Sequence, residues 1–205
     1  DRILDHTVSD SVIEDAINLD GDLPAATTGG SATRGSAITK TLTGVEAGDT
    51  LTFDYIFGSY DYLPYNDYSY VAIQQVDGSG NPIGAGIVLR GTGADGTYDV
   101  QDLKGPLNYT LAGQWSQSAT QQFSYTFDAG GTYNIAIGVT DVRDTIVDSA
   151  MLVSDIQLES GGETIAIQLT DFAAYGNAAT IFEVPNSVNA LVATGKYGTL
   201  IVTKA

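Results

Sequence analysis

Two acidic segments contain the side chains best suited to chemistry in this chain of 205 residues. The first, residues 60–68, mixes tyrosines and carboxylates around a proline. The second, residues 141–149, has three aspartates spaced three and four residues apart. Carboxylate oxygens are strong ligands for hard cations, and Ca²⁺ takes roughly six to eight oxygens. If the two segments meet in space, they form an oxygen-rich pocket with an aromatic rim, which favours a calcium-dependent binding site.

The aspartates of the second segment, Asp141, Asp144 and Asp148, would repel one another at close range unless a cation neutralises them. Arg143 offsets part of this charge, but one guanidinium does not satisfy three carboxylates. A bound calcium ion is the economical solution, with Asp61 or Asp67 and backbone carbonyls completing its shell. The alternative is that the three acids point separately into water.

Tyrosines gather around the first segment, because six of the chain's 12 tyrosines lie between residues 55 and 70. Tyrosine offers a large, rigid contact area and a hydroxyl group at low entropic cost. Pro64 restricts the segment and so lowers the cost of ordering it on binding. The alternative is that two or three of these rings cover the edge of a sheet. Four lie at or beyond the expected strand ends, where we expect them to face solvent: Tyr60, Tyr62, Tyr65 and Tyr68.

Strands must position both segments, because runs of alternating apolar residues lie on either side of them. Residues 51–57 place Leu51, Phe53, Tyr55 and Phe57 on one face, and residues 123–127 and 133–139 repeat the pattern. We expect half-buried strands of an antiparallel sheet, separated by turns at residues 44–49, 77–82 and 128–131. The chain is therefore predicted to be all-β, an antiparallel β-sandwich of the jelly-roll or lectin-like kind.

One short helix is expected before the sheet, with Asp10 and Ser11 capping residues 12–19, and we expect it to plug one end of the sandwich. Residues 159–163, which include two glycines, indicate a domain boundary. The tail beyond them is too short to form a sandwich alone, so it should pair with the first residues or with a neighbouring domain. We predict a β-sandwich ligand-binding domain at 13–158, with 1–12 and 163–205 belonging to a split or accessory β domain.

Composition excludes several functions. The 25 acidic and eight basic residues give a net charge of −17, which repels phosphate backbones and anionic membranes, so nucleic acid is not an expected partner. With no cysteine and only His6, the chain lacks thiolate and multi-histidine metal sites and the usual nucleophile and base pairs. Two carboxylates would suffice for a glycosidase, but their separation cannot be derived from a sequence. We therefore expect binding rather than catalysis.

The chain also lacks any stretch approaching the roughly 20 apolar residues that span a bilayer, so no membrane insertion is expected. An extracellular protein without disulfides must be stabilised by its core, by bound cations or by neighbouring domains. This requirement favours a bacterial surface protein.

Six runs of residues, taken together, resemble the peptide-binding domains of bacterial repeats-in-toxin (RTX) adhesins, and the resemblance extends over about residues 13–158. The runs are Gly35–Ile38, Ala47–Tyr55, Tyr65–Val71, Gly131–Tyr133, Gly138–Thr145 and Asp148–Asp155.

This resemblance implies a calcium-dependent module near the C-terminal end of a long extracellular fibre, which attaches a bacterium to another cell or to a biofilm. It implies binding to the extreme C-terminus of a target peptide or protein, whose carboxylate can join the calcium shell. It also implies insertion into a split domain and contact with neighbouring domains of the same adhesin. The implied metal or near-metal positions are Asp61, Asp67, Asp141, Asp144 and Asp148, and the predicted ligand-binding residues are Tyr60, Tyr62, Tyr65, Asn66, Tyr68 and Arg143.

Two other functions fit the same residues. Aromatic side chains beside carboxylates are also typical of a calcium-dependent, lectin-like module that binds glycans. A passive spacer, in which calcium ions only rigidify a fibre, would need the acids but no ligand.

Overall fold

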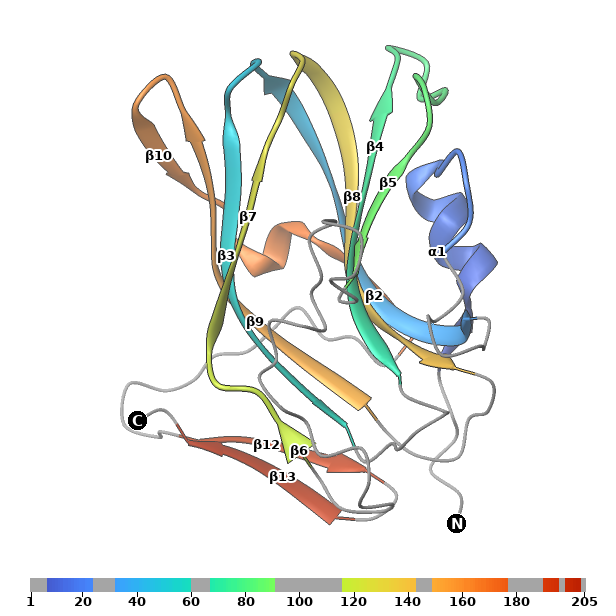
Figure 1. Ribbon diagram of the computed structural model, residues 1–205, viewed down its shortest axis with the longest axis vertical. Coiled ribbons are helices and arrows are strands. Elements are labelled where there is room, and N and C mark those ends of the chain that lie inside the picture. The colour runs from blue at the N-terminus through green and yellow to red at the C-terminus, as the bar shows by residue number, and fades with distance from the viewer. Residues whose placement is uncertain are drawn as a thin grey trace.

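The computed structural model describes residues 7–23, 32–59, 67–90, 116–142, 149–176, 190–195 and 198–203. Within these ranges two antiparallel sheets pack face to face, which confirms the predicted all-β sandwich with one short α-helix (Figure 1). The six-stranded sheet contains β1 (Val8–Ser9), β2 (Ala32–Val45), β4 (Tyr68–Val76), β5 (Ile87–Arg90), β8 (Gly131–Val142) and β11 (Ala173–Tyr175). The five-stranded sheet contains β3 (Thr50–Ser59), β6 (Ser116–Gln117), β7 (Gln121–Thr126), β9 (Ser149–Ser160) and β10 (Glu163–Ala166).

The remaining elements are two helices and a separate hairpin. They are α1 (Asp10–Ile17), the 3-10 helix η2 (Leu169–Asp171), and β12 (Ala190–Gly195) paired with β13 (Gly198–Thr203). In the six-stranded sheet the order is β1-β2-β8-β4-β5, and β11 pairs with β2 on the same side as β1. In the five-stranded sheet the order is β10-β9-β3-β6, and β7 continues the line of β6 along β3.

The sandwich has two ends, which the register of the strands identifies. At the turn end, at the top of Figure 1, short connections at residues 46–49, 77–86, 127–130 and 161–162 join strands that pair within a sheet or face each other across the core. At the opposite end, which we call the loop end, β3, β5 and β8 finish and β2, β4, β6 and β9 begin.

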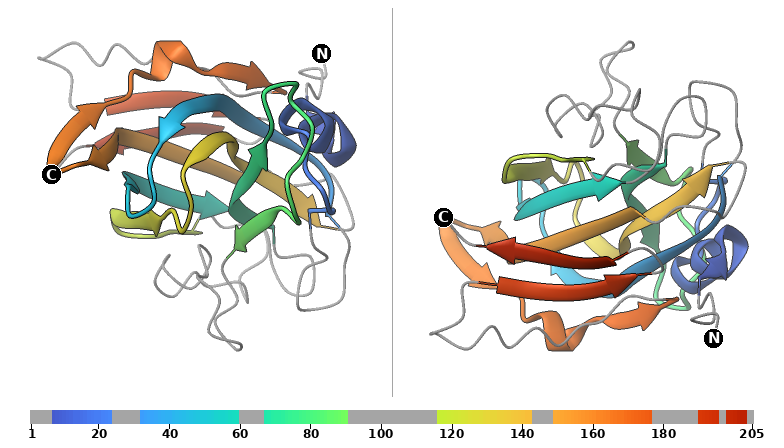
Figure 2. Two further views of the ribbon diagram at one scale, coloured as in Figure 1. Left: turned by 90° about the horizontal axis from the view of Figure 1, so that it is seen from above. Right: turned by 90° about the horizontal axis from the view of Figure 1, so that it is seen from below.

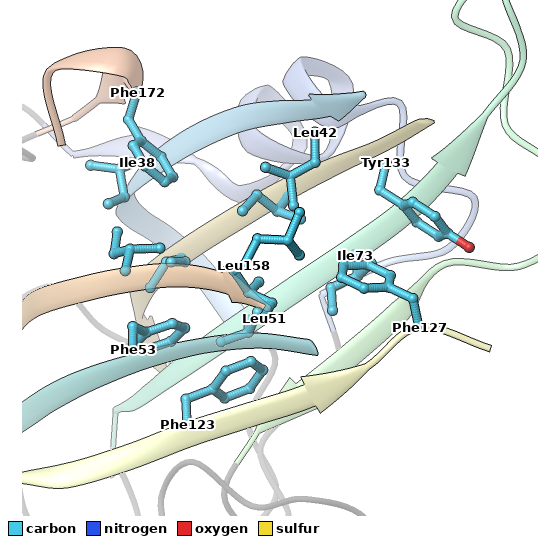
Figure 3. Packing of buried hydrophobic residues seen from close by; sticks show 14 of the residues in the cluster. Ile38, Leu42, Leu51, Phe53, Ile73, Phe123, Phe127, Tyr133, Leu158 and Phe172 are labelled. Carbon is cyan, nitrogen blue, oxygen red and sulfur yellow. The ribbon is translucent and has the colours of Figure 1, made fainter. Parts of the chain in front are cut away.

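Apolar side chains between the two sheets form the main core. The predicted face of β3 is confirmed, because Leu51, Phe53, Tyr55 and Phe57 are at most 1% exposed. The ring of Phe53 stacks on Phe123 of β7 with centroids 4.6 Å apart, and both lie deep between the sheets in Figure 3. Burial on this scale supplies the largest favourable contribution to folding.

Helix α1 covers the outer face of the six-stranded sheet, the face turned away from the five-stranded sheet (Figure 2). Its residues Ile13 and Ile17 pack on β4 and β8, so these strands are buried on both faces. The expected position at one end of the sandwich is therefore wrong, and so is the expectation that residues 133–139 are half-buried. The helix also begins earlier than expected, since its N-cap is Ser9 and Asp10 already lies within it.

The sandwich extends beyond the predicted domain limits. Gly161 and Gly162 have φ angles of +59° and +85°, and they form the tight turn between β9 and β10 rather than a domain boundary. Strands β1 and β11 pair with neighbouring stretches of β2, so residues 8–9 and 173–175 belong to the six-stranded sheet. Among the described residues of the predicted accessory domain, β12 and β13 are the strands that pair outside the two sheets.

Candidate functional site

Each acidic segment connects two strands at the loop end, and the strands of one pair lie beside those of the other. Residues 60–66 join β3 to β4, and residues 143–148 join β8 to β9, so each connection passes from one sheet to the other. Ser59, which ends β3, pairs with Ser149, which begins β9. Tyr68, which begins β4, pairs with Thr140 near the end of β8. Both connections therefore start and finish at neighbouring points of the fold.

A hydrogen bond joins the described ends of the two segments. Ser149, the last residue of the second segment, donates its hydroxyl proton to Oδ2 of Asp67 over 2.7 Å. Asp67 is only 2% exposed, so this carboxylate lies inside the loop end rather than on its rim. Because Asp67 precedes β4 and Ser149 begins β9, the bond also connects the two sheets.

Asp67 immediately precedes β4, and Asp141 lies on the adjacent strand β8. The β4–β8 ladder ends where Tyr68 pairs with Thr140, so Asp67 and Asp141 each lie one residue beyond that pair, and on its other side Asp141 pairs with Arg34 of β2. Side chains alternate between faces along a strand. Tyr68 and Thr140 point to the outer face, towards α1, so both aspartates point to the inner face.

The inner face becomes polar as the strands approach this end. Ser69 follows Asp67 by two residues on the same face, is fully buried, and its hydroxyl has no hydrogen-bond partner among the described residues. On the facing sheet, the backbone N–H of Phe57 donates to the hydroxyl of Ser118 over 3.1 Å, and the N–H of Ser118 returns a bond to the Phe57 carbonyl. The apolar core thus gives way to hydroxyl and carboxylate groups beside the connecting segments.

Tyr68 does not face solvent as expected. Its side chain is 1% exposed and its ring packs edge-on against Tyr70, with centroids 6.3 Å apart, beneath α1. The physical reason is strand alternation, since Tyr68 is the first residue of β4 and points to the face that the helix covers.

The other predicted site residues lie outside the described ranges, and their roles in binding remain predictions. They are Asp61, Asp144 and Asp148 for the metal, and Tyr60, Tyr62, Tyr65, Asn66 and Arg143 for the ligand.

Oxygen donors at the loop end have the chemistry that a calcium ion requires, but the described part of the chain does not complete a shell. Across those residues, no group of three or more histidine, cysteine, aspartate or glutamate side chains is close enough to hold a metal. Asp67 and Asp141 are two carboxylates of the several oxygens that calcium takes. Within the same residues, no helix is long and apolar enough to cross a membrane.

Sequence reasoning missed two residues that organise this region. Ser149 was not chosen because its partner Asp67 is 82 residues away and no local pattern signals the contact. Asp10 was interpreted as a helix cap, whereas its side chain contacts Thr140 of β8.

In comparisons with known proteins, no family model, curated protein or solved structure matched the chain.

Proposed function

We propose that the chain is a calcium-dependent ligand-binding module of a bacterial surface adhesin, which attaches the cell to other cells or to a biofilm. In this proposal the loop end binds the C-terminus of a target peptide or protein. The proposal rests chiefly on one observation, the hydrogen bond from Ser149 to the buried carboxylate of Asp67, which joins the described ends of the two acidic segments across the two sheets.

Electrostatics support a cation at this position. A buried carboxylate is costly unless it is paired or coordinates a metal. Asp67 is buried, and Asp141 follows Thr140, the register partner of Tyr68, on the neighbouring strand. The hydroxyl of Ser149 can satisfy one lone pair of Asp67 but brings no positive charge. A divalent cation would neutralise both aspartates, and in the proposal it draws further oxygens from Asp61, Asp144 and Asp148.

A bound cation would also attract an anionic ligand, which the charge of the whole chain repels. A net charge of −17 repels an anionic ligand such as a peptide carboxylate. A calcium ion with an open coordination position would reverse the local potential and supply a binding partner for that carboxylate. The predicted rim would then contact the peptide residues that precede the C-terminus. It consists of Tyr60, Tyr62, Tyr65, Asn66 and Arg143. Tyr68 has no place in that rim because its ring is buried.

The scaffold suits a module of this kind. Binding residues carried on connections function best when a rigid framework positions them. Strands β4 and β8, which lead into the two segments, are covered on both faces by the core and by α1. Extracellular placement accords with a cysteine-free chain that relies on its core and on bound cations.

The test is a binding screen of the full chain against a library of peptides with free C-termini, in calcium and in excess EGTA. We expect binding in calcium, loss of binding in EGTA, and loss of binding when the selected peptide is amidated at its C-terminus. Circular dichroism in EGTA should retain the β signal, which separates loss of the site from loss of the fold. Binding that persists in EGTA would contradict the calcium mechanism. Hits on a glycan array with none in the peptide library would replace the peptide ligand with a carbohydrate.

A further inference from the structure

A buried acid lies beneath the first turn of α1, outside the proposed calcium site. Asp10, the first residue of the helix, is 8% exposed. Its Oδ1 accepts a hydrogen bond from the hydroxyl of Thr140 on β8 over 2.9 Å. Its Oδ2 is enclosed and has no hydrogen-bond partner in the part of the chain that the structure describes. Half of this carboxyl group is therefore desolvated without compensation.

Tyr70 of β4 contributes a second unsatisfied group to the same cluster. Its side chain is fully buried, and its hydroxyl has no hydrogen-bond partner within the described ranges. The ring lies over Gly138, its register partner on β8, where an added Cβ would come within 2.7 Å of the hydroxyl oxygen. Burial raises the pKa of Tyr70 well above its usual value, and the nearby charge of Asp10 raises it further.

Within the described residues, the titratable groups that act on Asp10 or are acted on by it are Glu14 on α1 and Tyr70 of β4. Arg34 of β2 directs its guanidinium to Thr7 instead, donating to the Thr7 carbonyl over 2.7 Å and to its hydroxyl over 3.2 Å. Among the described residues, no lysine or arginine forms an ion pair with Asp10.

We propose that Asp10 is a proton-operated anchor for α1, whose neutral carboxyl holds the first turn of the helix on β8 and whose ionised form loosens it. The neutral group brings no charge into the enclosed position, where Oδ2 has no hydrogen-bond partner among the described residues, and it keeps the bond to Thr140 through Oδ1. The ionised group instead places an unpaired charge in a desolvated position. The helix is the element that responds, because Asp10 and its bond to Thr140 fix its first turn.

The direction of the effect follows from the surroundings of Asp10. Burial raises its pKa from 3.8 to about 6; the Thr140 hydrogen bond opposes this rise and the charge of Glu14 adds to it. Between these two pH values the folded protein holds a proton that the unfolded chain has released. Docking therefore weakens as pH rises through this interval, and the whole penalty is present above about 6.

The position of the anchor links the helix to the loop end. The side chains that α1 covers include Tyr68 and Tyr70 at the start of β4, and Thr140 is two residues from the end of β8. Loosening the first turn uncovers the outer face beside both connections. The inference concerns the helix alone and does not depend on the proposed calcium site.

Hydrogen exchange of the full chain at pH 5 and pH 8, corrected for the intrinsic rate, tests the anchor. We expect the protection of the amides of residues 14–17 in α1 to fall by about tenfold between the two conditions. Amides of Ile135 and Ile137 in β8 should keep their protection. Asp10→Asn is uncharged at both pH values, so its helix should stay protected at pH 8. Asp15→Asn, the same change at an exposed position of α1, should behave as the unmodified protein.

Equal helix protection at both pH values would overturn the proposal, and so would an Asp10→Asn variant that keeps the pH dependence. A second measurement is the ¹³C titration of the Asp10 carboxyl group, for which we expect a midpoint of about 6. A midpoint at the ordinary value of 3.8 would also overturn it.

Discussion

The two ends of the sandwich use the same residue type in different ways. At the turn end, acids satisfy backbone groups only a few residues away, as Asp49 does when its Oδ2 accepts the N–H of Glu46 over 2.8 Å. Asp77 likewise accepts the N–H groups of Ser79 and Asn81 with Oδ1. At the loop end, Asp67 accepts a hydrogen bond from Ser149, 82 residues away on the other sheet.

This difference separates structural acids from candidate ligand acids. A carboxylate that accepts several N–H groups in its own turn is already compensated. A buried carboxylate that bonds a hydroxyl on the other sheet, as Asp67 does, is suited to bind a cation as well. Counting acids, as in a net charge of −17, cannot distinguish the two cases, whereas the identity of their partners can.

The largest expected effect is on the core that both ends share. Phe53→Ala removes a ring that is 1% exposed and stacked on Phe123, so the free energy of unfolding should fall by about 3–5 kcal/mol. Urea denaturation measures this loss. Ser124→Ala, at an exposed position of β7, should change stability by less than about 0.5 kcal/mol. A similarly small loss for Phe53→Ala would mean that the two ends do not depend on this core.

The next largest expected effect is on calcium affinity, which should depend on acids at the loop end and not on acids at the turn end. Asp67→Ala removes a buried carboxylate from the proposed site, and calcium affinity measured by isothermal titration calorimetry should fall by about tenfold or more. Asp77→Ala removes an acid from the turn end and should leave the affinity unchanged. If the two variants lose affinity equally, the distinction between the ends fails.

A smaller effect is expected at a buried turn. Asp49 is 3% exposed, and Asp49→Ala leaves the N–H of Glu46 without its acceptor, so stability should fall by about 1 kcal/mol. Asp49→Asn keeps an acceptor oxygen and should lose less. Thermal unfolding should show the same loss in calcium and in EGTA. A loss of stability seen only in the presence of calcium would mean that this turn takes part in binding the metal.

The smallest effect is a pH dependence at the exposed turn. Hydrogen bonds from the Asn81 side chain, then from backbone N–H groups, hold the pKa of Asp77 below 3.8. Its contribution is therefore present above the unfolded value and is lost as pH falls through the lower folded value. Carboxyl titration by NMR should give a midpoint below 3.8, and Asn81→Ala should raise that midpoint. A midpoint unaffected by Asn81→Ala would show that the Asn81 side chain does not lower the pKa of Asp77.

Local patterns in the sequence predicted much of the fold. The alternation of Leu51, Phe53, Tyr55 and Phe57 defines the inner face of β3, and turn residues at 77–82 fall between β4 and β5. Patterns could not show that α1 would cover β4 and β8, because this burial depends on packing between distant segments. The same limit explains why Tyr68 was expected to face solvent. The glycines at 161–162 signalled a break in the strand but not that the chain turns back onto β9.

The candidate site was predictable in part. Asp67 and Asp141 follow from acids placed beside strand ends, and the strand register supplies what the spacing alone could not, that the start of β4 lies beside the end of β8. The partnership of Asp67 with Ser149 depends on two sheets meeting, so no window of sequence contains it. Asp10 fits a helix-capping pattern, and only the burial of its first turn reveals another role.

A crystal of the full chain grown in calcium, with its anomalous signal mapped, tests the central claim that the loop end holds the cation. We expect a peak whose ligand oxygens, at about 2.3–2.6 Å, include the carboxylate of Asp67 and residues of the 141–149 segment. Calcium bound only at turn-end acids such as Asp77, or no ordered calcium at millimolar concentration, would contradict it.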